Sequence, residues 1–251
     1  MSFAALAGVN GLAKSDVITP TNGVLCLTFD DSHFVAWEAT LPIFARYNAH
    51  ATFFAYHEID EKAVVSLRRL SKAGHSIGLH GYKHLRAPET IAELGEAGYV
   101  ATEIEPQLSV CRAAGLPVRS FAYPYNARTE ETDAMLVRHG FSRLRAGSVS
   151  FSPFHAAELK SRRHFDGLGI GPIYNRDGNE VAAMLESVAA NNEVAVFFSH
   201  GIFDKSIHNH MSRTDLETIL SAAQKLGIAV LGFDELDSAC SSASSEIQDA
   251  H

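Results

Sequence analysis

Residues 193–200 read EVAVFFSH, and this stretch is the clearest guide to the fold. Every residue of Val194–Phe198 is apolar, a pattern typical of a strand that is covered on both faces. Similar short apolar runs recur along the chain and alternate with helical stretches, so we predict an α/β fold with a parallel sheet. The expected strands are Val24–Thr28, Ala51–Ala55, Ser76–Leu79, Arg119–Tyr123, Phe141–Leu144, Glu193–Ser199 and Ile228–Gly232.

Apolar residues spaced three and four apart indicate helices between these strands. Two sets have this spacing: Val181, Met184, Leu185 and Val188, then Leu216, Ile219, Leu220 and Ala223. We expect the second helix to begin at Thr214, with Glu217 completing a capping box, and to end at Gly227.

The composition excludes several classes of protein. The chain has 251 residues, of which 46% are hydrophobic, which is enough for one large domain with a full core. Its 29 acidic and 21 basic residues give a net charge of −8, whereas a nucleic-acid binder needs a basic face. No apolar run approaches the roughly 18 residues of a membrane-spanning helix. We therefore expect neither a nucleic-acid partner nor a membrane span.

The chain shows no repeat, linker or break in composition, so we predict a single domain. We place it at residues 20–237, after an N-terminal extension (1–19) and before a flexible tail (238–251). No Lys or Arg precedes Lys14, so the first residues lack the basic start of a secretory signal. We expect a cytoplasmic protein unless the sequence begins on a processed form.

Polar residues that can carry chemistry follow four of the predicted strands. They are Asp30 and Asp31 after the first strand, His80 and His84 after the third, Pro124 and Tyr125 after the fourth, and His200 after the sixth. In an α/β barrel the carboxyl ends of the strands share one face, where active sites are built. We therefore expect these side chains to line one cleft.

Two imidazoles and a carboxylate in this cleft are typical of a metal site. His80 and His84 are four residues apart and can lie on one side of a helical turn, which suits two ligands of one ion. A strand-end Asp completes a set that leaves metal positions open for water and substrate. If the first strand continues, Asp30 and Asp31 point in opposite directions, so one can bind the metal while the other accepts a proton.

These residues lie in longer motifs that resemble the polysaccharide deacetylases (carbohydrate esterase family 4, with a NodB-like domain). The motifs are Thr28-Phe29-Asp30-Asp31, Ala51-Thr52-Phe53-Phe54, Gly74-His75-Ser76-Ile77-Gly78-Leu79-His80-Gly81-Tyr82-Lys83-His84, Phe121-Ala122-Tyr123-Pro124-Tyr125 and Phe198-Ser199-His200. The resemblance runs from about residue 24 to residue 237. It implies a distorted, incomplete (β/α) barrel of about seven parallel strands. It also implies a metal-dependent hydrolase that removes N-acetyl or O-acetyl groups from a carbohydrate polymer or oligomer.

The resemblance also assigns roles to individual residues. A divalent metal, usually zinc in this family, would be bound by Asp31, His80 and His84. Asp30 would be the base that activates water, and His200 would protonate the leaving amine. The backbone N–H of Tyr125 would stabilise the oxyanion together with the metal. Pro124, which precedes it in the motif, is a candidate for a substrate-binding or supporting role.

Two residues depart from the family pattern. Gly81 stands where the family usually has Ser or Thr, so a hydroxyl that supports the loop is missing. Ala122 stands where many members have an Arg that pairs with the catalytic Asp. A subset of bacterial exopolysaccharide deacetylases has the same Phe-Ala-Tyr-Pro-Tyr sequence, so the change marks a subgroup. Arg119 or Arg145 is then a candidate partner for Asp30.

Other residues are candidates for supporting roles. Asp166 is our candidate for the carboxylate that orients His200, although the same residue also fits a turn. Trp37 is the only Trp, and it either stacks on a sugar ring or packs in the core or at the edge of the groove. Its helical spacing with later apolar residues favours the second alternative. We expect His208 and His210 to be solvated in a polar loop.

Two other functions stay open on the sequence alone. The missing arginine at Ala122 and the lack of an export signal are compatible with a hydrolase of small cyclic amides or ureides on the same scaffold. A sugar-binding protein without activity is a third reading, although binding alone does not need both Asp30 and His200. The expected substrate is therefore an acetylated glycan or, alternatively, a small amide.

Overall fold

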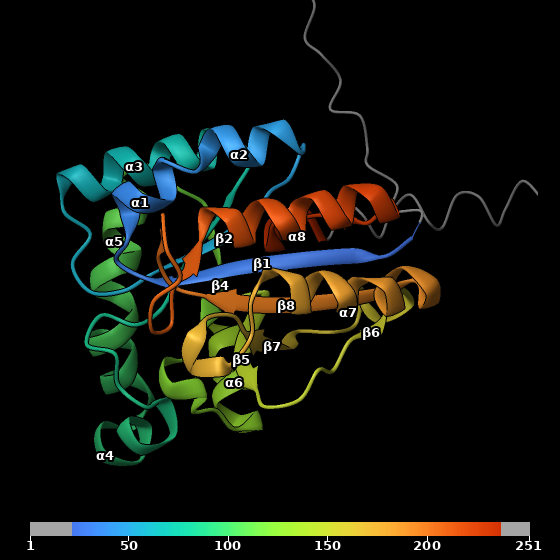
Figure 1. The fold of residues 1–251 in the computed structure, drawn as a ribbon. Coiled ribbons are helices and arrows are strands. Elements are labelled where there is room, and N and C mark those ends of the chain that lie inside the picture. Colours follow the sequence, from blue (N-terminus) through green and yellow to red (C-terminus); the bar gives the residue numbers. More distant parts are fainter. Residues whose placement is uncertain (1–21, 237–251) are drawn as a thin grey trace, which may run out of the picture.

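Seven parallel strands close into a barrel in the computed structural model, which describes residues 22–236 (Figure 1). The strand order is β1-β2-β3-β4-β5-β7-β8, and β8 pairs back with β1 over Val24–Phe29. The strands are β1 (Val24–Asp31), β2 (Thr52–Ala55), β3 (Ser76–Leu79), β4 (Val118–Ala122), β5 (Arg143–Ser148), β7 (His164–Gly169) and β8 (Glu193–Ser199). The predicted α/β barrel is confirmed. The expected extension (1–19) and tail (238–251) lie outside the described residues.

One barrel strand was not predicted, and one predicted strand lies outside the barrel. β7 has the sequence HFDGLG, in which glycines replace the apolar run that usually marks a strand. Gly169 is required there because a Cβ would lie 2.6 Å from the ring of Tyr174. The predicted strand Ile228–Gly232 is shorter in the structure, where only Ala229–Val230 form a strand, β11. β11 pairs with Val24 and Leu25 at the start of β1, because β2 pairs with β1 only from Thr28 onward.

Eight α-helices pack around the barrel within residues 22–236 (Figure 1). They are α1 (Phe34–Glu38), α2 (Leu41–Arg46), α3 (Glu61–Lys72), α4 (Ala87–Tyr99), α5 (Glu105–Ala113), α6 (Glu130–Arg138), α7 (Gly178–Asn191) and α8 (Arg213–Leu226). A π-helical turn (Val100–Ile104) joins α4 to α5. The short strands are β6 (Phe154–His155), β9 (Ile202–Phe203) and β10 (Met211–Ser212). None of the helices in this part of the chain combines the length and apolar character needed to cross a membrane.

The predicted apolar stripes are the inner faces of α7 and α8. Leu216, Ile219 and Leu220 are fully buried against the barrel, and each such side chain stabilises the fold by roughly 1.5–3 kcal/mol relative to exposure. α8 ends at Gly227 as predicted, with a φ of 70°. Its cap lies earlier than expected, because Ser212 Oγ accepts a hydrogen bond from the Asp215 backbone N–H at 2.9 Å.

Successive residues of the strands supply two separate cores. Val24 and Cys26 of β1 belong to a cluster inside the barrel, whereas Leu25 and Leu27 pack against the helices. This alternation follows from the two-residue period of a strand. Because the lumen and the outer layer are both filled, the polar residues at the strand ends are held on a rigid support.

Candidate active site

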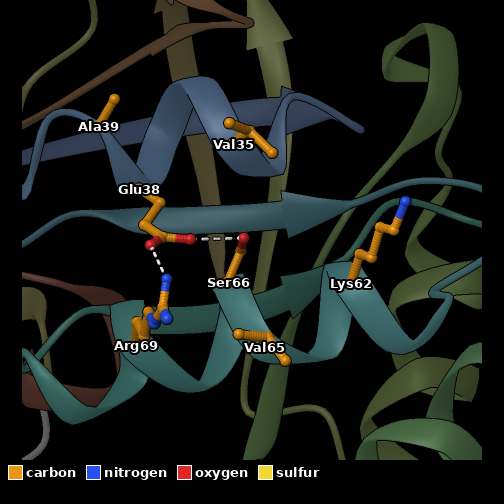
Figure 2. A pocket seen from close by; sticks show the side chains of 7 residues that line it. All are labelled: Val35, Glu38, Ala39, Lys62, Val65, Ser66 and Arg69. Carbon is orange, nitrogen blue, oxygen red and sulfur yellow. Dashed lines mark hydrogen bonds and ion pairs between the residues drawn. The ribbon is translucent and has the colours of Figure 1, made fainter.

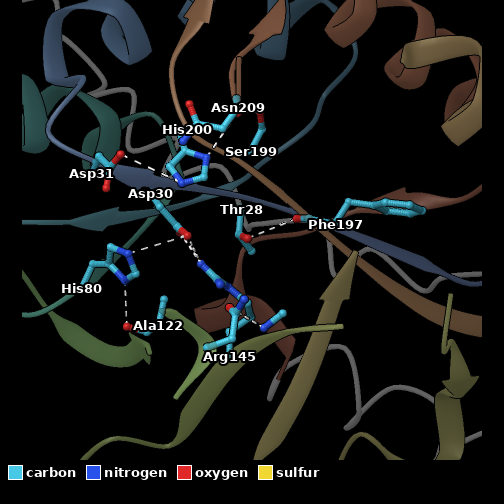
Figure 3. A network of polar contacts seen from close by, with 12 residues as sticks. Thr28, Asp30, Asp31, His80, Ala122, Arg145, Phe197, Ser199, His200 and Asn209 are labelled. Carbon is cyan, nitrogen blue, oxygen red and sulfur yellow. Dashed lines mark hydrogen bonds and ion pairs between the residues drawn. The ribbon is translucent and has the colours of Figure 1, made fainter. Parts of the chain in front are cut away.

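The carboxyl ends of the barrel strands bring five of the predicted site residues together, and Figure 3 shows four of them, Asp30, Asp31, His80 and His200. His80 Nε2, after β3, lies 3.9 Å from an Asp30 carboxylate oxygen at the end of β1. His200 Nε2, after β8, lies 4.0 Å from a carboxylate oxygen of Asp31. His84 Nε2 lies 3.1 Å from His80 Nε2. The geometry therefore contains the expected combination of two carboxylates and three imidazoles.

Asp30 is held in place by Arg145, which reaches it from β5. Nη2 of Arg145 donates hydrogen bonds to both carboxylate oxygens, and both side chains are almost completely buried. Burial by itself would raise the pKa of Asp30, but the charge of Arg145, with smaller effects of His80 and His200, holds it below its ordinary value. Asp30 is therefore ionised in a site that excludes most water.

Asp31 differs from the expectation of a continuing strand. Its φ is 84°, a left-handed conformation that ends the extended backbone at this residue. As a result, Asp30 and Asp31 do not simply alternate between faces, and both carboxylates lie among the site imidazoles. Burial, together with the neighbouring charge of Asp30, raises the pKa of Asp31 to about 6.

Asp31, His80 and His84 offer ligand atoms that all lie within 4.8 Å of one another. His80 Nδ1 is 2.9 Å from the Ala122 carbonyl, which can only accept, so the ring proton is on Nδ1 and the lone pair of Nε2 faces His84. Burial lowers the pKa of His80 to about 4, which keeps the imidazole neutral. Two facing imidazole nitrogens beside a carboxylate fit a divalent cation.

The loop that carries these two histidines is not the helical turn that their spacing suggested. Residues 80–86 have no helix or strand, and both Gly81 (φ 81°) and His84 (φ 60°) are left-handed. The two imidazoles meet because the loop folds back on itself, so the i, i+4 interpretation was wrong in its geometry.

The side chain and the backbone carbonyl of His200 are each held by a hydrogen bond. Its Nδ1 lies 3.2 Å from the Asn209 carbonyl, to which it donates, so Nε2 is left facing Asp31. Its backbone carbonyl accepts a hydrogen bond of 2.9 Å from the indole N–H of Trp37. Burial lowers the pKa of His200, and the ring is therefore neutral in this state.

Tyr125 lies at the edge of the same cleft. It belongs to the turn Pro124–Asn126, has a φ of 55° and is 57% exposed, whereas Pro124 is buried beneath it. Its ring centroid is 4.6 Å from that of His84, and the Arg86 guanidinium lies 4.7 Å over the ring. Among residues 22–236 no acceptor is bound to the Tyr125 backbone N–H, which is therefore free to donate to a ligand.

The family model of polysaccharide deacetylases matches residues 18–144. This chain belongs to the polysaccharide deacetylase family. The matched segment includes Asp30, Asp31, His80, His84 and Tyr125, and it stops before Arg145 and His200. No curated protein matches the chain.

Solved structures of deacetylases share the fold of the whole domain. The peptidoglycan deacetylase PdaC from Bacillus subtilis is 16% identical, with a TM-score of 0.58 over 91% of this chain and 96% of that chain. The chitin deacetylase from the fungal pathogen Colletotrichum lindemuthianum is 17% identical, with a TM-score of 0.60 over 87% of this chain and 88% of that chain. A family 4 carbohydrate esterase from Streptomyces lividans, in complex with acetate, is 16% identical, with a TM-score of 0.54 over 83% of this chain and 92% of that chain.

The arginine that this deacetylase lacks at position 122 is supplied by the next strand. Ala122 and Arg145 are directly paired neighbours on β4 and β5, and a small residue on β4 leaves room for the long side chain from β5. The other candidate, Arg119, is exposed. The absence of Arg at position 122 therefore no longer favours the cyclic-amide alternative.

Two supporting residues are placed differently from the prediction. Asp166 lies on β7 and not in a turn, and its carboxylate is 3.5 Å from His164. The Asn209 carbonyl, and not Asp166, is bonded to the ring of His200. Trp37 is fully buried, with its ring 5.1 Å from that of Phe53, so it cannot stack on a sugar.

A cluster of three aromatic rings, those of His33, Phe203 and His210, lies beside His200 and was not predicted. His210 is not a solvated loop residue: its Nδ1 accepts a hydrogen bond from the Gly201 N–H at 2.9 Å. Its ring centroid lies 4.8 Å from that of His33 and 5.1 Å from that of Phe203. His33 follows β1, whereas Phe203 and His210 lie in the segment after β8, so the fold brings these rings together.

A separate hollow lies between α1 and α3 (Figure 2). It is lined by Val35, Glu38, Ala39, Lys62, Val65, Ser66 and Arg69. Glu38 accepts hydrogen bonds from Ser66, at 2.6 Å, and from Arg69, so three of the four polar side chains that line the hollow bind one another. None of its lining residues was predicted to belong to the active site.

Proposed function

We propose that this polysaccharide deacetylase removes acetyl groups from an acetylated carbohydrate with a divalent cation held by Asp31, His80 and His84. The observation that carries the proposal is the convergence of these three ligand atoms within 4.8 Å, between the Asp30–Arg145 pair and His200. Nitrogen and carboxylate ligands favour zinc, although other first-row ions fit such a set. When bound, the cation supplies Lewis-acid polarisation of the acetyl carbonyl and lowers the pKa of water.

Asp30 is the proposed general base. It accepts a proton from the attacking water while the water oxygen bonds to the acetyl carbon. Arg145 keeps the carboxylate ionised and fixes its two oxygens, which favours one direction of proton transfer. The base therefore acts from a fixed position, which lowers the entropic part of the barrier.

Tyr125 and His200 are the proposed partners of the charges that develop during the reaction. The Tyr125 N–H donates to the oxyanion, an interaction worth about 3–4 kcal/mol in the transition state. His200 is neutral at rest, so before the carbon–nitrogen bond breaks it takes up, at Nε2, the proton that Asp30 removed from the attacking water. It then passes this proton to the leaving nitrogen, which returns Asp30 to its ionised state and His200 to its neutral state. The products are acetate and a free amine on the sugar.

An N-acetylated amino sugar is the substrate class that we favour. The solved structures with this fold include a peptidoglycan deacetylase and a chitin deacetylase, and these names support the assignment. The exposed ring of Tyr125 with Arg86 over it provides a planar, polar surface beside the cleft. A sugar can pack its apolar face on such a ring while its hydroxyls remain solvated.

The proposal is tested by measuring acetate release from chito-oligomers before and after chelation of metal. Chelation should abolish turnover, and added Zn²⁺ should restore it. His80→Ala should lose both bound metal and activity, whereas His139→Ala, at an exposed position after α6, should keep both. Full acetate release by His80→Ala would refute the proposal. Turnover of allantoin-like amides without turnover of any acetylated sugar would favour the alternative substrate.

A further inference from the structure

Glu103 is a buried carboxylate next to the proposed metal site. It is completely inaccessible to solvent, although it carries an ionisable side chain. It lies in the π-helical turn Val100–Ile104, and turns of this kind are rare and frequently found at functional sites. The steps of the reaction proposed above make no use of it.

Glu103 binds the backbone of the loop that joins His80 to His84. Its Oε1 accepts a hydrogen bond from the Lys83 N–H at 3.0 Å, and its Oε2 accepts one from the Leu85 N–H at 3.1 Å. Its backbone carbonyl accepts a third, from the Tyr82 N–H at 3.0 Å. A loop without helical hydrogen bonds needs other acceptors for its N–H groups, and this one residue provides three of them.

Gly81 is shaped to this carboxylate. A Cβ at position 81 would lie 2.6 Å from Oε2 of Glu103 and 3.3 Å from Cγ of Pro124. The residue also has a φ of 81°, which L-amino acids with a side chain rarely adopt. Gly81 and Glu103 are therefore complementary: the missing side chain leaves the space that the carboxylate occupies.

We propose that Glu103 is a positioning residue that holds the loop 80–85 so that His80 and His84 converge on one cation. It acts through the loop backbone and does not itself contact the ion. In this chain it takes over the support that a hydroxyl at position 81 would provide. The inference rests on the proposed metal site, and its test reads metal binding separately from acetate release.

The direct test is Glu103→Gln, which keeps the size of the side chain but turns one acceptor into a donor. Binding of Co²⁺ is followed by competition with a chelator and by its visible absorption, which reports ligand geometry. We expect the affinity for Co²⁺ to fall about 10–100-fold, the usual effect of removing a group that supports a metal ligand. We also expect the visible absorption spectrum of bound Co²⁺ to change. Glu105→Gln is the matched control, because Glu105 is an exposed partner of Arg112 at 2.9 Å.

A second variant approaches the same contact from the loop. Gly81→Ala places a methyl group against the carboxylate and should also weaken Co²⁺ binding about tenfold or more. Gly115→Ala is its control, because Gly115 has a φ of 69° but a Cβ there would meet nothing within 4 Å. The control thus has similar backbone strain without the contact. This variant tests the proposal even if Glu103→Gln does not fold.

The outcomes separate the two proposals. Wild-type affinity and an unchanged Co²⁺ spectrum in folded Glu103→Gln or Gly81→Ala would overturn the role of Glu103. Faster hydrogen exchange of amides 82–85, together with weaker binding and recovery of most activity at saturating metal, would support it. If the wild-type protein binds Co²⁺ but releases no acetate from any acetylated sugar, the proposed function fails and the metal affinities still decide the role of Glu103.

Discussion

Replacement of Arg145 should be the most destructive single change in the active site that leaves the proposed metal ligands intact. The variant Arg145→Met keeps much of the side-chain volume but removes the charge. It leaves the carboxylate of Asp30 buried, with a side-chain exposure of only 3%, and without its two charged hydrogen bonds. At this low exposure water replaces few of the lost hydrogen bonds, so most of the desolvation cost is uncompensated.

The expected loss is about 3–5 kcal/mol of unfolding free energy, the usual effect of removing one member of a buried ion pair. For a chain of this size that corresponds to a fall in Tm of roughly 6–20 °C. Urea unfolding followed by circular dichroism measures the loss directly. Activity should fall as well, because the base loses its fixed orientation.

A surface pair and a double variant complete this test. Arg138→Met breaks the exposed pair with Glu96, 2.8 Å apart, and should cost at most about 1 kcal/mol. Asp30→Asn combined with Arg145→Met should recover much of the lost stability, because no buried charge remains, but none of the activity. A cost of Arg145→Met as small as that of the surface variant would refute the reasoning.

Three further predictions follow from buried contacts. Trp37→Phe removes the hydrogen bond to the His200 carbonyl and should cost about 1 kcal/mol in urea unfolding; acetate release should also fall while Co²⁺ affinity is kept. Burial, with a smaller effect of a neighbouring imidazole, lowers the pKa of His75 to about 3. Below pH 6.5 the unfolded chain therefore binds a proton at His75 that the folded chain does not bind. The contribution of neutral His75 to the unfolding free energy is complete above pH 6.5 and is lost as the pH falls toward 3. His75→Asn keeps an acceptor without titrating, so its unfolding free energy should fall by roughly 2–3 kcal/mol less than wild type between pH 7 and pH 4. Gly169→Ala puts a methyl group 2.6 Å from the ring of Tyr174 and should lower the unfolding free energy by roughly 1–3 kcal/mol; an unchanged Tm would contradict this.

Local patterns in the sequence were sufficient for most of the barrel. A strand buried on both faces must be apolar throughout, and EVAVFFS at 193–199 therefore predicted β8 correctly. β7 was missed because HFDGLG lacks this pattern. Gly169 is required by the close approach of Tyr174, and Gly167 lies against Phe198 and Arg145, contacts that are made only in the folded chain. Ile228–Gly232 looked like a full strand, but only two residues, Ala229 and Val230, pair with β1.

The motifs placed the polar residues at the strand ends, because a strand followed by polar side chains is a local feature of the chain. Their partners were decided by closure of the barrel. Asp30 meets Arg145 across 115 residues of sequence, since β4 contributes only Ala122 beside β5. His200 is oriented by the carbonyl of Asn209, which no side-chain motif can reveal. Contacts to backbone atoms and between distant segments leave no periodic trace in a sequence, so only the tertiary structure could assign them.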